Sequence, residues 1–69
     1  MMNFRKTHYA NFYRNSWIST NAINEVMIME RPDGDFEFWN ESDLVSLHPS
    51  FEIAVRAAAS TVPFKMPAA

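Results

Sequence analysis

The chain has 69 residues, 48% of them hydrophobic and 20% charged, a composition typical of one small folded domain over residues 1–69. It contains no cysteine, which excludes disulfides, thiolate metal sites and a cysteine nucleophile. No stretch approaches the roughly 20 apolar residues of a membrane span, and no apolar signal-peptide segment follows the first basic residues. The sequence therefore favours a soluble protein of the cytoplasm.

Charge is strongly segregated along the chain, although the net charge is only −2. Residues 1–24 contain three cations and no acidic residue, whereas residues 25–52 contain all eight Asp and Glu residues and a single cation. Residues 53–69 add two cations. Such asymmetry bears on binding partners and association rates more than on the fold.

The N-terminal third fits two kinds of structure. The aromatic residues from Tyr9 to Trp17 recur at i, i+3, i+4 and i+8, which is helical spacing. The same segment, NFYRNSWIST, is rich in aromatic and β-branched residues and is interrupted by Asn and Ser, which favours strand and turn. We expect at least one strand around residues 17–20 to pair with the hairpin described next, because a lone hairpin is rarely stable.

The segment EVMIMERPDGDFEFWN predicts a β-hairpin over about residues 26–39. Pro32 sets φ for the second position of a type I turn, Asp33 suits the third, and Gly34 supplies the positive φ of a following bulge. This three-residue loop places Glu30 opposite Phe36. A two-residue Asp33-Gly34 turn is the alternative, and it would shift the register and regroup the side chains.

With the three-residue loop, alternate residues of the hairpin divide between two faces of a sheet. One face, expected to be the core face, carries Val26, Ile28, Phe36 and Phe38. The other carries Met27, Met29, Glu37 and Trp39.

A C-terminal helix is predicted over about residues 50–60. Ser50 is a suitable N-cap, and Phe51, Ala54, Val55 and Ala58 form an apolar stripe at helical spacing. Pro63 prevents continuation, so residues 63–69 are expected to form an extended tail. The fold class is therefore α+β: an antiparallel sheet of two to four strands built on the hairpin, with the helix packed on one face.

Catalytic and metal-binding patterns are weak. His8 and His48 lie forty residues apart without the spaced partners of a metal site. Ser46, His48 and Asp43 could be drawn together as a triad, but no nucleophile-elbow motif surrounds the serine. We therefore expect no enzyme activity, no cofactor and no metal.

A small basic and aromatic segment lies near the N-terminus. Its cations, Arg5, Lys6 and Arg14, alternate with aromatic residues, as in proteins that hold single-stranded nucleic acids. Three cations make a weak footprint in an acidic chain, and we expect these aromatic residues in the core rather than on a binding surface. Direct nucleic-acid binding is not expected.

The acidic hairpin is the candidate partner-binding surface. Several carboxylates crowd around one turn, and alternate strand residues such as Asp35 and Glu37 lie about 6.6 Å apart, comparable to successive phosphates of a nucleic-acid strand. Solvation of an ordinary hairpin tip is the competing interpretation. The predicted surface consists of Glu30, Asp33, Asp35, Glu37, Trp39, Glu41 and Asp43.

The segments RPDGDFEFWNESDL and HPSFEIAVRAAA, together 26 of the 69 residues, resemble small phage-encoded anti-CRISPR proteins in size, acidity and hairpin-then-helix order. The resemblance is one of type, without a shared motif. It implies a non-enzymatic inhibitor in the cytoplasm of a bacterial host, which binds a basic surface of a CRISPR effector subunit as a DNA mimic. The alternative is a structural or regulatory interaction module, either a monomer or a weak homodimer that buries Trp39 and the methionines.

Overall fold

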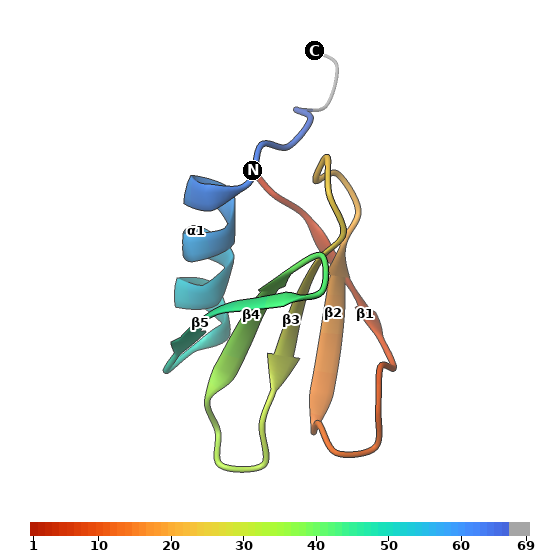
Figure 1. Cartoon of the computed structure of the whole chain (residues 1–69), viewed down its shortest axis with the longest axis vertical. Helices are drawn as coiled ribbons and strands as arrows, with labels where there is room; N and C mark the ends of the chain where they lie inside the picture. Colours follow the sequence, from red (N-terminus) through yellow and green to blue (C-terminus); the bar gives the residue numbers. More distant parts are fainter. Residues whose placement is uncertain (67–69) are drawn as a thin grey trace.

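The computed structural model describes residues 1–66, which form an α+β fold: a five-stranded antiparallel sheet with one C-terminal helix packed on it (Figure 1). The elements, in chain order, are β1 (Phe4–Thr7), β2 (Asn15–Ser19), β3 (Val26–Glu30), β4 (Phe36–Asn40), β5 (Asp43–His48) and α1 (Phe51–Thr61). The spatial order of the strands is the same as their order in sequence. The sheet is therefore a simple meander with β1 and β5 at its edges.

The sheet has one strand more than the upper limit of the prediction. The expected strand near Trp17 is β2, which pairs with β3 as predicted. Strands β1 and β5 complete the sheet. The helical alternative for the N-terminal third is wrong, because Tyr9, Phe12 and Tyr13 lie in the connection between β1 and β2.

The hairpin formed by β3 and β4 confirms the predicted three-residue loop. The amide of Gly34 donates to the carbonyl oxygen of Arg31 at 3.0 Å, and Gly34 has a φ of +96°. The register pairs Glu30 with Phe36. Pro-Asp-Gly fixes this geometry locally, because proline sets one φ and only glycine tolerates the positive φ of the bulge without strain.

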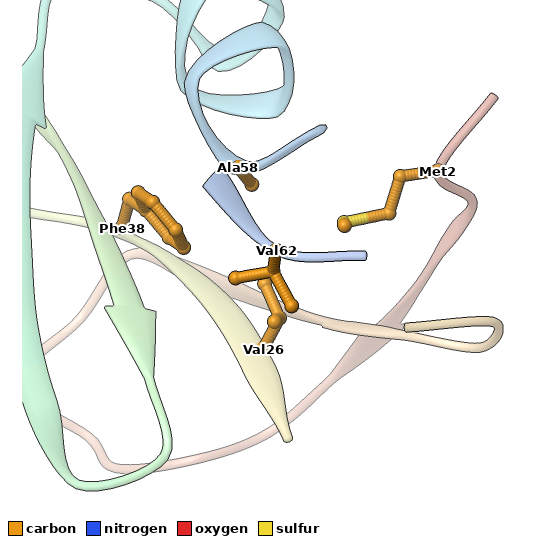
Figure 2. Close-up of a cluster of buried hydrophobic side chains, with 5 residues drawn as sticks. All are labelled: Met2, Val26, Phe38, Ala58 and Val62. Carbon is orange, nitrogen blue, oxygen red and sulfur yellow. The ribbon is translucent and has the colours of Figure 1, made fainter. Parts of the chain in front are cut away.

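Helix α1 lies over β3, β4 and β5 and closes the core. Ser50 caps it as predicted: its hydroxyl accepts a hydrogen bond from the Ile53 amide at 3.2 Å. Ala54 and Ala58 are fully buried, and their small side chains let the helix approach the sheet closely. Figure 2 shows the resulting cluster, in which the side chains of Met2, Val26, Phe38, Ala58 and Val62 converge between helix and sheet.

An aromatic group extends the core at the start of α1. The ring of Phe51 lies 4.5 Å from that of Trp17, 6.2 Å from Phe4 and 6.3 Å from Phe36, measured between centroids. These residues come from β1, β2, β4 and α1, so the group ties the edge strand β1 to the rest of the fold. Such aromatic pairs add about 0.5–1.5 kcal/mol each beyond the area they bury.

Residues 63–66 follow α1 and pair back onto the chain, whereas residues 67–69 of the predicted extended tail lie outside the described part. Ala22 and Phe64 form an antiparallel bridge, and the Lys65 amide donates to the carbonyl oxygen of Asn21 at 2.8 Å. Phe64 packs against the core cluster. No helix within residues 1–66 is long and apolar enough to cross a membrane.

Candidate functional site

The face of the sheet opposite α1 is covered by the connection between β1 and β2. Met27 and Met29 of β3 point to this face, yet they are only 7% and 2% exposed. Tyr13 of the connection reaches over the sheet to Glu37 of β4, whose side chain is also buried. The sequence suggested a homodimer that buries Trp39 and the methionines. Met27 and Met29 are not available for such an interface, because the chain itself already covers them.

Glu37 is the polar centre of this covered face. Its Oε1 accepts hydrogen bonds from the Tyr13 hydroxyl and from Trp39 Nε1, both at 2.7 Å. Its Oε2 forms an ion pair with Arg31 Nε at 2.6 Å. The carboxylate thus fixes the indole of Trp39, the side chain of Arg31 and the path of the connection between β1 and β2.

The hydrogen bonds also set the protonation state of the cluster. Burial alone would raise the pKa of the Glu37 carboxyl, but the bonds from Trp39, Arg31 and Tyr13 outweigh it and lower the pKa below its usual value. Burial, followed by the hydrogen bond to the Glu37 carboxylate, raises the pKa of Tyr13 to about 12. At neutral pH the pair is therefore a carboxylate and a neutral phenol.

Two of the predicted partner-binding carboxylates lie in positions unsuited to that role. Glu37 is only 4% exposed and its oxygens are occupied by partners within the chain. Glu30 is half-buried, accepts a hydrogen bond from Asn15 Nδ2 at 2.9 Å and faces the helix side of the sheet. A continuous acidic row through Asp35 and Glu37 is therefore not present on the surface.

The four remaining carboxylates are exposed, but in two separate groups. Asp33 and Asp35 lie at the turn between β3 and β4, where Asp33 accepts a hydrogen bond from the Asp35 amide. Glu41 and Asp43 lie at the turn between β4 and β5. The two turns are at opposite ends of β4, about 16 Å apart for five strand residues.

Glu41 of the second group lines a recess that includes the predicted Trp39. The recess has a volume of about 310 Å³ and is lined by Tyr9, Glu25, Met27, Met29, Trp39, Glu41 and Ser42. Trp39 is half-buried and held by Glu37, whereas Tyr9 is 60% exposed. The recess therefore combines two aromatic side chains with two carboxylates.

The backbone places both carboxylates at the recess. The amide of Glu41 donates to the carbonyl oxygen of Glu25 at 2.7 Å, which holds the two chain segments together. Glu41 has a φ of +57°, the one positive φ of a non-glycine residue in the described chain. Glu41 and Ser42 form a two-residue loop with positive φ at its first residue, the pattern of a type II′ turn that favours glycine there.

Sequence reasoning missed three contributors to this face. Tyr13 and Tyr9 were expected in the core with the other aromatic residues of the N-terminal segment; instead Tyr13 is half-buried over Glu37 and Tyr9 is exposed at the recess. Glu25 lies outside the predicted hairpin. The one signal that could have placed Glu25 near the β4–β5 turn is the register of the hairpin: Val26 pairs with Asn40, so the preceding residue, Glu25, lies beside Glu41.

The fold does not bring together the residues of the catalytic triad or metal site that the sequence analysis considered. Ser46 Oγ lies 2.7 Å from His48 Nε2 on β5, but Asp43 is at the other end of that strand. Within residues 1–66, no three His, Asp or Glu side chains are grouped as metal ligands would be.

No protein-family model, curated protein or solved structure matches this chain. The function therefore has to be inferred from the site.

Proposed function

We propose that the chain is a non-enzymatic protein-binding module that receives cationic side chains of a partner protein in the recess between Tyr9 and Trp39. The observation that carries this proposal is the composition of the recess: two aromatic side chains flanked by Glu25 and Glu41, neither of which has an ion pair within residues 1–66. Lysine and arginine are attracted by aromatic faces and by carboxylates, and both attractions strengthen when water is excluded.

The surroundings of the recess support a basic partner. Asp43 lies on the turn that carries Glu41 and is exposed, and no cation lines the recess. The exposed cations lie elsewhere: Arg5 and Lys6 are on edge strand β1, Arg14 follows in the connection between β1 and β2, and Arg56 is on α1. A basic partner would be attracted to the carboxylates of the recess, with an on-rate that falls with added salt.

The likeness to anti-CRISPR proteins makes a CRISPR effector subunit the first partner to test. The DNA site of such a subunit is basic, and carboxylates that occupy it would compete with the phosphates of target DNA. The proposed activity is therefore inhibition by occupancy, without any chemical step on the effector.

The recess itself is tested by NMR titration with a hexa-arginine peptide. We expect the Trp39 Nε1–H signal and the amides of the β4–β5 turn to shift progressively, and the shifts to disappear in 0.5 M salt. The variant Glu25→Gln/Glu41→Gln should weaken binding at least tenfold. The matched control Asp33→Asn/Asp35→Asn removes two charges at the other turn and should change binding less than threefold. Equal losses of affinity in both variants would mean that only the net charge of the chain matters, and would contradict binding in the recess.

The partner is tested by competition between this chain and labelled target DNA for a purified CRISPR effector complex. We expect displacement of DNA by the native chain and at least tenfold weaker displacement by Glu25→Gln/Glu41→Gln. If the chain binds hexa-arginine but does not displace DNA from the effector, the recess is a cation-binding site and the CRISPR effector is not its partner. Glu37 is left unchanged in both experiments, because its side chain holds Trp39 and Tyr13 in place beside the recess.

A further inference from the structure

The two edges of the sheet differ in how they are protected against another strand. Edge strand β1 is short, and it exposes Arg5 and Lys6, the charged side chains with which natural sheets discourage edge pairing. Edge strand β5 has no charged residue between Asp43 and His48. Its outer backbone groups form no hydrogen bond to another backbone segment within residues 1–66.

Strand β5 also exposes apolar side chains. Leu44, Val45 and Leu47 are 44%, 45% and 45% exposed. A β-bulge opposite Phe38 and Trp39 interrupts the register, so that Leu44 pairs with Trp39 and Leu47 pairs with Glu37. Cross-strand partners share a face, so both leucines lie on the face opposite α1, although they are three residues apart.

The helix adds an exposed apolar residue on the same side of the molecule. Phe51, Val55 and Arg56 line a recess together with residues 1–4, so that flank of α1 faces β1. At about 100° per residue, Ile53 lies on the opposite flank, toward β5, and is 43% exposed.

We propose that strand β5 is a self-association site, where two copies of the chain pair antiparallel about a two-fold axis and form one continuous sheet. The pattern of β5 is self-complementary in the register that overlaps all six of its residues. This register places Leu44 opposite Leu47 of the second copy, twice over, on the face away from α1. On the helix side it places Asp43 opposite His48 of the second copy, since these two residues pair with Asn40 and Phe36 of the same face.

The energetics favour a weak dimer. Pairing adds about four to six backbone hydrogen bonds and buries the leucines and Ile53 on the two faces. One strand and a few side chains per copy make an interface smaller than the roughly 800 Å² per partner of standard complexes. We therefore expect a dissociation constant in about the micromolar range. The inference does not depend on the proposed function, because it uses the free edge and not the recess.

Analytical ultracentrifugation over micromolar to millimolar concentrations tests self-association. The native chain should approach twice the mass of one chain as concentration rises, and Leu47→Lys should weaken the dimer at least tenfold. Ile23→Lys is the matched control, since Ile23 is 57% exposed but lies between β2 and β3. Circular dichroism checks that each variant is folded. A monomer at every concentration, or a dimer indifferent to Leu47→Lys, would overturn the proposal.

Cysteine cross-linking tests the register, and it is free of background because the chain has no cysteine. A tagged Leu44→Cys chain mixed with a Leu47→Cys chain should give a disulfide-linked heterodimer on a non-reducing gel, since opposed Cα atoms lie about 4.5–5.5 Å apart. Each variant alone should cross-link at least tenfold less, because like positions are about 10 Å apart along the strands. Equal cross-linking in all three samples would overturn the pairing, including the case where the bulge twists this edge away from a partner strand.

Discussion

At the scale of single residues, the Glu37 carboxylate connects three separate parts of the chain. It joins Tyr13 from a loop, Arg31 from a turn and Trp39 from its own strand. Hydrogen bonds to a charged group contribute more than neutral ones, and an unpaired buried carboxylate is costly. Substitutions around Glu37 should therefore report on how firmly the connection between β1 and β2 is held.

We expect Tyr13→Phe to lower the free energy of unfolding by about 1.5 kcal/mol, because it removes one charge-assisted hydrogen bond from a half-buried site. Urea denaturation measures the change. Tyr9→Phe is the control: the Tyr9 hydroxyl has no hydrogen-bond partner within residues 1–66, and its loss should change stability by less than about 0.5 kcal/mol. Similar losses in both variants would mean that the Glu37 bond contributes little.

The same carboxylate should make the fold sensitive to acid. Its pKa is lower in the folded chain than in the unfolded one, so it stabilises the fold above the unfolded pKa of about 4.3 and loses this contribution as the pH falls through the folded pKa. Glu37→Gln should show a smaller loss of stability between pH 5 and pH 2 than the native chain. Parallel pH profiles of thermal unfolding would contradict this assignment.

Glu41 occupies a backbone conformation that suits glycine. Its φ of +57° costs about 1–2 kcal/mol for a residue with a Cβ. Glycine avoids this cost, but it also makes the unfolded chain more flexible, which offsets part of the gain in stability. We expect Glu41→Gly to raise the unfolding free energy by about 0.5–1 kcal/mol, whereas Glu41→Ala, which keeps the Cβ, should not. If the recess binds cations as proposed, Glu41→Gly will be more stable and bind hexa-arginine less well.

At the scale of elements, the hairpin and the helix could be predicted because their signals are local. Pro32 and Gly34 define the turn, and Ser50 defines the start of α1. Strand β5 could not, because its bulge places Leu44 and Leu47 on one face and so breaks the two-residue period that identifies a strand.

The recess could not be predicted from local signals either. Tyr9 comes from the connection between β1 and β2, and its position depends on how that connection crosses the sheet. The acidic window was visible in the sequence, but the division into two exposed groups and a buried Glu37 depends on strand register and on Tyr13.

The packing of α1 on the sheet depends on the small size of its buried residues. Ala58 is fully buried in the cluster with Val26 and Phe38. We expect Ala58→Leu to lower the unfolding free energy by about 1–3 kcal/mol, because the larger side chain forces the helix away from the sheet. Ser60→Leu, an exposed position of the same helix, is the control for helix propensity. Equal urea midpoints for the two variants would show that the helix is not closely packed.

At the scale of the whole molecule, basic and acidic residues lie on different strands of the sheet. The β1 edge is basic, whereas exposed carboxylates border both ends of β4. Opposite charges on different parts of the surface can orient the molecule during encounter with a charged partner. This separation could be anticipated from the sequence, since charge is segregated along the chain and the sheet keeps the order of the sequence.

The meander also determines the order in which the protein assembles and opens. Each strand pairs only with its neighbours in sequence, so the sheet can form hairpin by hairpin. The side-chain amide of Asn21 joins segments far apart in sequence, since it donates to the carbonyl oxygens of Met1 and Lys65 at 3.0 and 2.9 Å. We expect amide hydrogen exchange to be slowest in β3 and fast at Lys65, by at least a hundredfold. Opening at Asn21 would then release the C-terminal segment while the sheet stays intact.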